Sequence, residues 1–120
     1  MTRTGPTNKY LQELIIGLRK QSKTENAPIW RDVAEKLGTP RRKRVEVNLS
    51  DIERNSEGKE VVLVPGVVLS NGHLVKPLTV AAWKFSKEAV KKIHDSKGKS
   101  ITIEELMKEN PKGSNVKLMV

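Results

Sequence analysis

Four consecutive cations form the stretch of this sequence whose side chains are best suited to bind a ligand. Arg41, Arg42, Lys43 and Arg44 follow Pro40 and lead directly into an alternation of apolar and polar residues. Arginine forks match the oxygens of a phosphate and keep their charge at cytoplasmic pH. The run therefore predicts a phosphate-binding joint between two parts of the chain. A solvated loop with no binding role explains the same residues about equally well.

The positive charge of the chain is unevenly distributed. Residues 1–44 hold 11 Lys and Arg against 4 Asp and Glu, or +7, and residues 45–120 hold 12 against 10, or +2, of a net +9. Such an excess predicts a polyanionic partner, because each phosphate that a cation neutralises releases condensed counterions. Nucleic acid is the favoured polyanion, with an acidic protein or an anionic membrane surface as alternatives.

The sequence offers few groups for catalysis or metal binding. It has no cysteine, and its two histidines, His73 and His94, show no metal-ligand spacing. The paired acids Glu104 and Glu105 fall in the first turn of an expected helix, where the helix dipole favours negative charge without any catalytic role. No phosphate-cradling glycine loop or nucleophile elbow occurs. We therefore predict a protein that is not an enzyme and has no cofactor and no metal.

The length of 120 residues suits a single domain with one core. No apolar run approaches the roughly 20 residues that span a bilayer, and the first residues lack the apolar segment of a secretory signal. A cytoplasmic location is the expectation.

Two amphipathic helices are expected before the cation run. The first carries one apolar stripe at i, i+3, i+4 and i+7, formed by Leu11, Leu14, Ile15 and Leu18. A polar connection at residues 21–26 should follow it. The second helix should begin at Pro28, whose missing N–H would have no partner in a first turn, and end at Gly38. Trp30 lies on the apolar stripe of this second helix, which favours a core role over base stacking.

The periodicity changes to two from Arg44 onward, which is typical of strands. Val45, Val47 and Leu49 should face the core. A single helical turn is expected at residues 50–54, and a buried strand interrupted by Pro65 and Gly66 at residues 61–69.

The second half of the chain should contain a hairpin, two helices and a last strand. Asn71-Gly72 predicts a two-residue turn that returns the chain through Leu74 and Val75, before another strand at residues 78–85. Ser86 should cap a helix that Gly98 ends. Thr102 and Glu105 have the spacing of a capping box for a second helix, and residues 116–120 should form the last strand.

The distribution of aromatic and basic residues favours binding of an RNA backbone over reading of bases. A stacking reader needs an aromatic platform, and this chain has four aromatic side chains, of which Trp30 is assigned to the core. A helix-turn-helix has a turn of three or four residues, shorter than the expected connection, and its second helix reads bases. Here the cations follow the second helix, where they suit phosphates better.

The order and spacing of several short segments resemble those of the archaeal and eukaryotic large-subunit ribosomal protein L-eighteen-e family, a relative of bacterial ribosomal protein L-fifteen. The resemblance runs from Thr7 to Val116, and the compact size looks archaeal. The segments that carry it are Trp30-Arg31-Asp32-Val33-Ala34, Pro40-Arg41-Arg42, Val47-Asn48-Leu49, Ile52-Glu53-Arg54, Val64-Pro65-Gly66, Val80-Ala81-Ala82, Phe85-Ser86 and Asn110-Pro111-Lys112-Gly113-Ser114.

This resemblance implies a structural constituent of the large ribosomal subunit that binds large-subunit ribosomal RNA beside neighbouring large-subunit ribosomal proteins. It implies an irregular β-β-α superhelical α/β domain with a helical N-terminal part. A DNA-binding regulator built on residues 8–37 is the alternative. The residues predicted to contact RNA are Arg3, Lys9, Arg41, Arg42, Lys43, Arg44, Asn48 and Arg54.

The expected organisation has two parts. Residues 1–6 should form a flexible basic arm, and residues 7–120 a single domain. Within that domain we expect a helical part at 7–38, the basic joint at 39–48, and a strand-rich core with two helices at 49–120.

Overall fold

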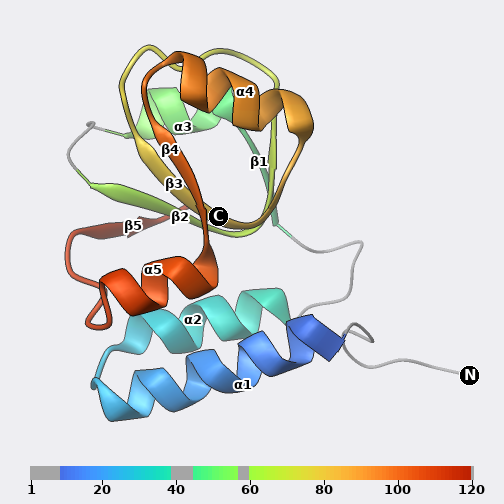
Figure 1. Ribbon diagram of the computed structural model, residues 1–120. Coiled ribbons are helices and arrows are strands. Elements are labelled where there is room, and N and C mark those ends of the chain that lie inside the picture. The colour runs from blue at the N-terminus through green and yellow to red at the C-terminus, as the bar shows by residue number, and fades with distance from the viewer. Residues whose placement is uncertain (1–8, 39–44, 57–59, 120) are drawn as a thin grey trace, which may run out of the picture.

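A parallel β-sheet lies between two layers of helices in the computed structural model, which describes residues 9–38, 45–56 and 60–119 (Figure 1). The mixed α/β class and the helical N-terminal part agree with the sequence-based prediction. Among the described residues, no helix has the length and apolar character that crossing a bilayer requires. The elements are α1 (Lys9–Thr24), α2 (Pro28–Leu37), β1 (Val45–Asn48), α3 (Leu49–Asn55), β2 (Val61–Leu69), β3 (Thr79–Phe85), α4 (Lys87–Asp95), β4 (Lys99–Thr102), α5 (Ile103–Glu109) and β5 (Val116–Leu118).

Helices α1 and α2 pack side by side as an antiparallel pair (Figure 1). The predicted stripe of α1 is buried, and α2 begins at Pro28 and is capped at Gly38, as expected. The indole of Trp30 is 0% exposed, and its Nε1 donates to the carbonyl oxygen of Pro111 at 2.6 Å. The predicted connection at residues 21–26 was too long, because α1 continues to Thr24. The antiparallel, side-by-side course of the two helices differs from the crossed pair of a helix-turn-helix (Figure 1).

All strand pairs of the sheet are parallel. Strand β2 is central: β3 pairs along one edge, and β1 and β5 share the other edge end to end. Residues 66–69 of β2 pair with β1, while residues 61–63 pair with β5. Strand β4 extends the sheet beyond β3.

The hairpin predicted at Asn71-Gly72 is wrong. Strands β2 and β3 run parallel, and residues 70–78, which join them, contain no strand at Leu74 or Val75. The backbone oxygen of Asn71 accepts from the N–H of Ser50 at 3.0 Å, so this segment is tied to the start of α3. Asn71-Gly72 still marks a change in the direction of the chain. The new direction follows from the bond to Ser50 in α3, which is distant in sequence, and not from a hairpin turn.

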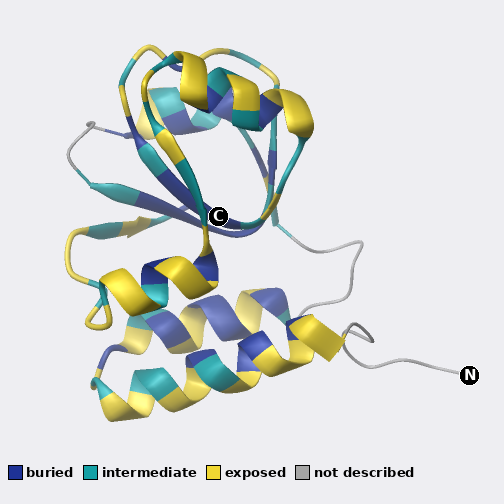
Figure 2. Cartoon of the chain, viewed as in Figure 1, coloured by how far each residue is buried: buried dark blue, intermediate teal, exposed yellow. Residues whose placement is uncertain are grey.

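The two faces of the sheet bury two separate cores, visible as dark blue residues in Figure 2. Alternation along the strands divides them: Leu63 and Ala81 face the helices α1, α2 and α5, whereas Val62 and Val80 face α3 and α4. Val47 is buried in the α3/α4 core, and Val45 packs against it, as the sequence predicted. Both faces of a parallel sheet need such cover, because neither is solvated.

The helices after β1 follow the predicted caps with some differences in length. The single turn expected at residues 50–54 is the seven-residue helix α3. Ser86 caps α4 by accepting from the N–H of Ala89, and Thr102 and Glu105 form the capping box of α5. Strand β4 was not predicted, and the last strand, β5, is shorter than the expected 116–120.

Gly66 allows β1 to approach β2. A Cβ atom built at Gly66 would lie 2.0 Å from the backbone oxygen of Val45, which is far inside contact distance. By contrast, a Cβ at Gly17 in α1 would meet only the Cε of Met107, at 4.0 Å. Packing therefore requires a glycine at Gly66 but not at Gly17.

We predict that Gly66→Ala lowers the free energy of unfolding by about 1–3 kcal/mol, because β1 must move to admit the methyl group. Gly17→Ala should raise it by about 0.5–1 kcal/mol, because glycine is a poor residue inside a helix. Urea unfolding of the two variants measures both effects, and equal midpoints would contradict the role given to Gly66.

Candidate nucleic-acid interface

The described residues that flank the two basic stretches lie on one side of the molecule. Lys9 begins α1, Gly38 follows α2 and Val45 begins β1, and all three ends are on the right in Figure 1. The antiparallel packing of α1 and α2 produces this placement, because it brings the start of one helix beside the end of the other. The predicted contact residues Arg3, Arg41, Arg42, Lys43 and Arg44 lie outside the described residues.

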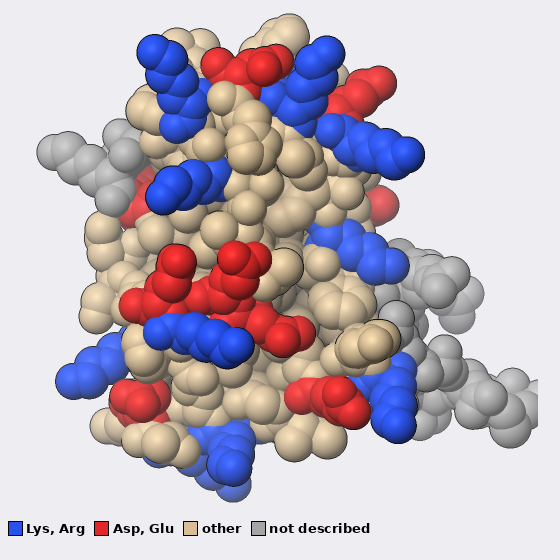
Figure 3. Space-filling view, in the orientation of Figure 1, with Lys and Arg blue, Asp and Glu red and all other residues tan. Residues whose placement is uncertain are grey.

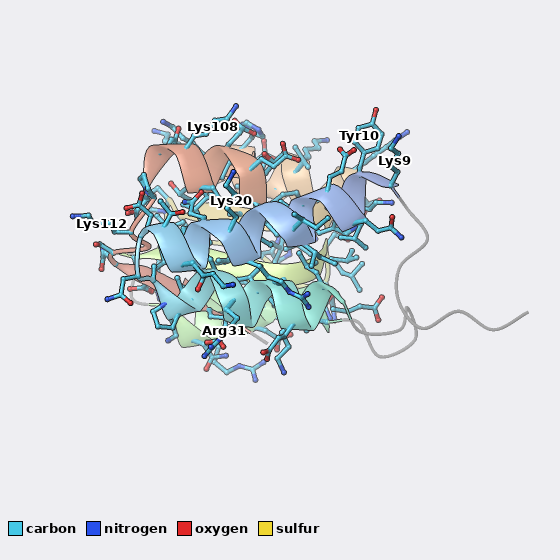
Figure 4. All side chains as sticks on the ribbon, turned by 90° about the horizontal axis from the view of Figure 1, so that it is seen from below. Lys9, Tyr10, Lys20, Arg31, Lys108 and Lys112 are labelled. Atoms are coloured by element: carbon cyan, nitrogen blue, oxygen red, sulfur yellow. The ribbon has the colours of Figure 1, made fainter. Side chains whose placement is uncertain are left out.

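Lys9 is exposed at the first turn of α1, beside Tyr10 (Figure 4). Tyr10 is 76% exposed. Neither side chain contributes to the apolar stripe that packs α1 on the fold. The position therefore leaves the Lys9 ammonium accessible to a phosphate.

Asn48 has a structural role at the start of α3. Its backbone N–H donates to the Asp51 carboxylate at 3.2 Å, as in a capping box. Its side-chain Oδ1 accepts from the backbone N–H of Asn71 at 3.3 Å, which holds the segment after β2. With Oδ1 engaged in the fold, the Nδ2 amide is the part of this side chain that could donate to RNA.

Arg54 lies in the last turn of α3 with a side chain that is 71% exposed. Its guanidinium is 3.9 Å from the Asp51 carboxylate, an exposed pair whose net contribution to stability is small. Lys9 and Arg54 lie on opposite faces of the sheet, in the α1/α2 and α3/α4 layers (Figure 1). The structure therefore does not bring these two predicted contacts together.

Several lysines in the second half of the chain bond to backbone carbonyls. Lys92 donates to the oxygens of Ser70 and Gly72 at 2.8 and 2.9 Å, and Lys117 donates to the oxygen of Asn55. These ammonium groups bond to carbonyls of the loop after β2 and of the last residue of α3. Sequence reasoning missed this use, because the carbonyls lie 20 to 62 residues away along the chain.

Exposed cations also occur on the layer of α1, α2 and α5. Lys20 on α1, Arg31 on α2 and Lys112 in the turn before β5 project from this side of the molecule (Figure 4). The described part of the chain contains no ion pair with any of the three. These three side chains add positive charge to this layer, and none of the contacts described above gives them a structural role.

The Glu53 carboxylate joins α3 to the segment that precedes β3. Its Oε1 accepts from the backbone N–H groups of Val75 and Lys76 at 2.8 and 3.3 Å, and its Oε2 lies 3.3 Å from the Lys76 ammonium. The hydrogen bond from the Val75 N–H is the main cause that lowers the pKa of Glu53 from its ordinary value of 4.5. Desolvation, the next largest effect, raises this pKa, and the backbone and ammonium of Lys76 lower it further.

A parallel α/β fold in a chain of net charge +9 suits a protein that binds an RNA backbone, and comparison with known proteins identifies the class as ribosomal. A family model described as "Ribosomal protein 60S L18 and 50S L18e" matches residues 2–120. The chain belongs to this family.

Relatives from three archaea support the same family assignment. The large ribosomal subunit protein eL18 of Methanopyrus kandleri is 47% identical, over 97% of this chain and 95% of its own. The proteins of the same name from Archaeoglobus fulgidus and Methanococcus maripaludis are 49% and 50% identical, over 95% and 94% of this chain and 97% and 94% of theirs.

The family confirms the resemblance read from the sequence. The chain is a structural constituent of the large ribosomal subunit, and the alternative of a DNA-binding regulator is not supported. Proteins of this family are not known as enzymes.

We predict that Glu53→Gln destabilises the fold at pH 7 and that this difference shrinks in acid. Because folding lowers the pKa of Glu53, its stabilisation is present above the ordinary pKa and disappears as the pH falls through the folded-state value. Urea unfolding between pH 7 and pH 3 measures the difference in the free energy of unfolding between the variant and the unmodified protein. Glu109→Gln, which removes one exposed charge from α5, controls for net charge, and a Glu53→Gln difference that does not change with pH would contradict the prediction.

Proposed function

We propose that this constituent of the large subunit binds large-subunit ribosomal RNA through phosphate contacts centred on the side where Lys9, Gly38 and Val45 lie. One observation supports the proposal: the described residue that follows the arm and the two that flank residues 39–44 lie on the same side of the fold. We infer that Arg3 and the cations at residues 41–44 bind phosphates of the same RNA surface. Lys9 adds a cation on that side.

Phosphate contact explains the choice of residues better than base reading does. The exposed surface of α2 alternates in charge, with Arg31 and Lys36 beside Asp32 and Glu35, which does not suit a helix in a major groove. Consecutive arginines and lysines, by contrast, provide charge and donors for a backbone whatever its sequence. Asn48 and Arg54, which lie apart from Lys9, are proposed to add separate hydrogen bonds to the RNA.

The proposal also covers the organisation of the chain, its location in the cell and its neighbours. Residues 1–6 act as a basic arm on one domain at residues 7–120, in which residues 39–48 are the joint between the helical part and the strand-rich part. The protein works in cytoplasmic ribosomes, next to other large-subunit proteins. No cofactor is needed for such a role.

Replacing residues 41–44 with alanine should weaken RNA binding and flatten its dependence on salt. For every phosphate that is no longer neutralised, the slope of log K against log salt should change by about 0.7 to 0.9. Binding to salt-stripped large-subunit RNA, measured between about 50 and 200 mM salt, tests this.

A matched control removes the same number of positive charges from β3, α4 and β4. Lys84, Lys87, Lys91 and Lys99 are exposed on β3, α4 and β4, and their replacement with alanine should leave the slope nearly unchanged. An unchanged slope in the 41–44 variant, or an equal change in the control, would refute the assignment.

A further inference from the structure

A groove of about 410 Å³ separates α1 from α5 on the layer that faces away from α3 and α4. The two helices lie side by side in Figure 4, and Gln21 ties them together near one end by donating to the oxygens of Met107 and Pro111 at 3.0 and 3.2 Å. The lining residues come from one face of each helix: Tyr10, Glu13, Leu14, Gly17, Gln21, Glu104, Met107 and Lys108.

The floor of the groove is apolar and adaptable. Leu14 and Met107 contribute to the packing beneath it, and Tyr10 stands at its open end with most of its surface exposed. Gly17 keeps the groove wide, since a side chain there would project toward Met107. Tyrosine and methionine are residues that interfaces favour, because one offers a rigid amphipathic surface and the other a flexible one.

The rim of the groove is acidic in a chain whose net charge is +9. Glu13 and Glu104 line it, and Glu105 and Glu109 follow on α5, where Figure 3 shows acidic side chains gathered around one lysine. Within the described ranges, neither Glu13 nor Glu104 forms an ion pair, even though Lys108 also lines the groove. Such a rim repels phosphates and attracts cations.

We propose that this groove docks a segment of a neighbouring large-subunit protein that carries lysine or arginine around one apolar side chain. The apolar side chain would lie over Leu14 and Met107 beside Tyr10, and the cations would meet Glu13 and Glu104. The acidic rim favours a basic protein segment, because it would repel the phosphates of RNA. The apolar floor favours a segment with an apolar side chain, because a free counterion has nothing to bury there. This inference rests on the proposed place of the chain in the large subunit.

Photo-crosslinking in assembled large subunits tests the proposal. Tyr10 is replaced by benzoylphenylalanine, the subunits are purified by sedimentation and irradiated, and the joined peptides are identified by mass spectrometry. We expect a peptide of another ribosomal protein with a net positive charge. Benzoylphenylalanine at Ile16, which is 66% exposed on α1 but does not line the groove, is the control and should not join that peptide.

Two groove variants make the result specific. Gly17→Leu fills the groove at a helical position that accepts leucine, and the pair Glu13→Lys and Glu104→Lys reverses the rim charge. Each should lower the yield of the Tyr10 crosslink at least about tenfold, because one blocks the anchor and the other places like charges across the interface. Circular dichroism and urea unfolding check that the variants fold.

The remaining outcomes overturn the inference. These are a crosslink to RNA, to residues 1–8 of the same chain, to a second copy or to an acidic peptide, the absence of any crosslink, or a yield unchanged in folded groove variants. Failure of the proposed function looks different, because it shows as an unchanged salt slope of RNA binding in the 41–44 variant and does not depend on the Tyr10 crosslink.

Discussion

The structure depends on one constraint: β2 has two edges but pairs with three strands. The edge opposite β3 is divided between β5 at residues 61–63 and β1 at residues 66–69. The division falls at Pro65 and Gly66, where the register with β3 also shifts between Val64 and Val67. Proline has no N–H to give to a ladder, and glycine admits the close backbone of Val45. Two residues thus end one strand pairing and begin the next.

The sequence predicted the elements whose signals are local. Caps at Ser86 and Thr102, the start of α2 at Pro28 and the stripe from Leu11 to Leu18 follow from neighbouring residues, and the structure confirms them. It did not predict β4 or the parallel course of β3, because parallel pairing is decided by residues far apart in the chain. Asn71-Gly72 illustrates this, since its usual hairpin is overridden by the bond from Ser50.

The candidate site was predictable in composition but not in arrangement. The cation run was evident in the sequence, and residues 41–44 remain a prediction because they lie outside the described part. The sequence could not show that Asn48 uses Oδ1 to hold Asn71, or that Lys92 bonds to two carbonyls. Charge counting treats every lysine alike, whereas only the fold separates those that bond within the protein from those that face outward.

The bond from Trp30 to Pro111 spans 81 residues, and β5, near the end of the chain, completes the edge of β2. Helices α1 and α2 therefore have no complete surface to pack against until almost all of the chain has been made. Contacts this distant in sequence slow folding, because loop closure precedes the gain from burial. The packing of the two N-terminal helices therefore depends on residues that are made much later, and it is completed only after Pro111 and β5 have been synthesised.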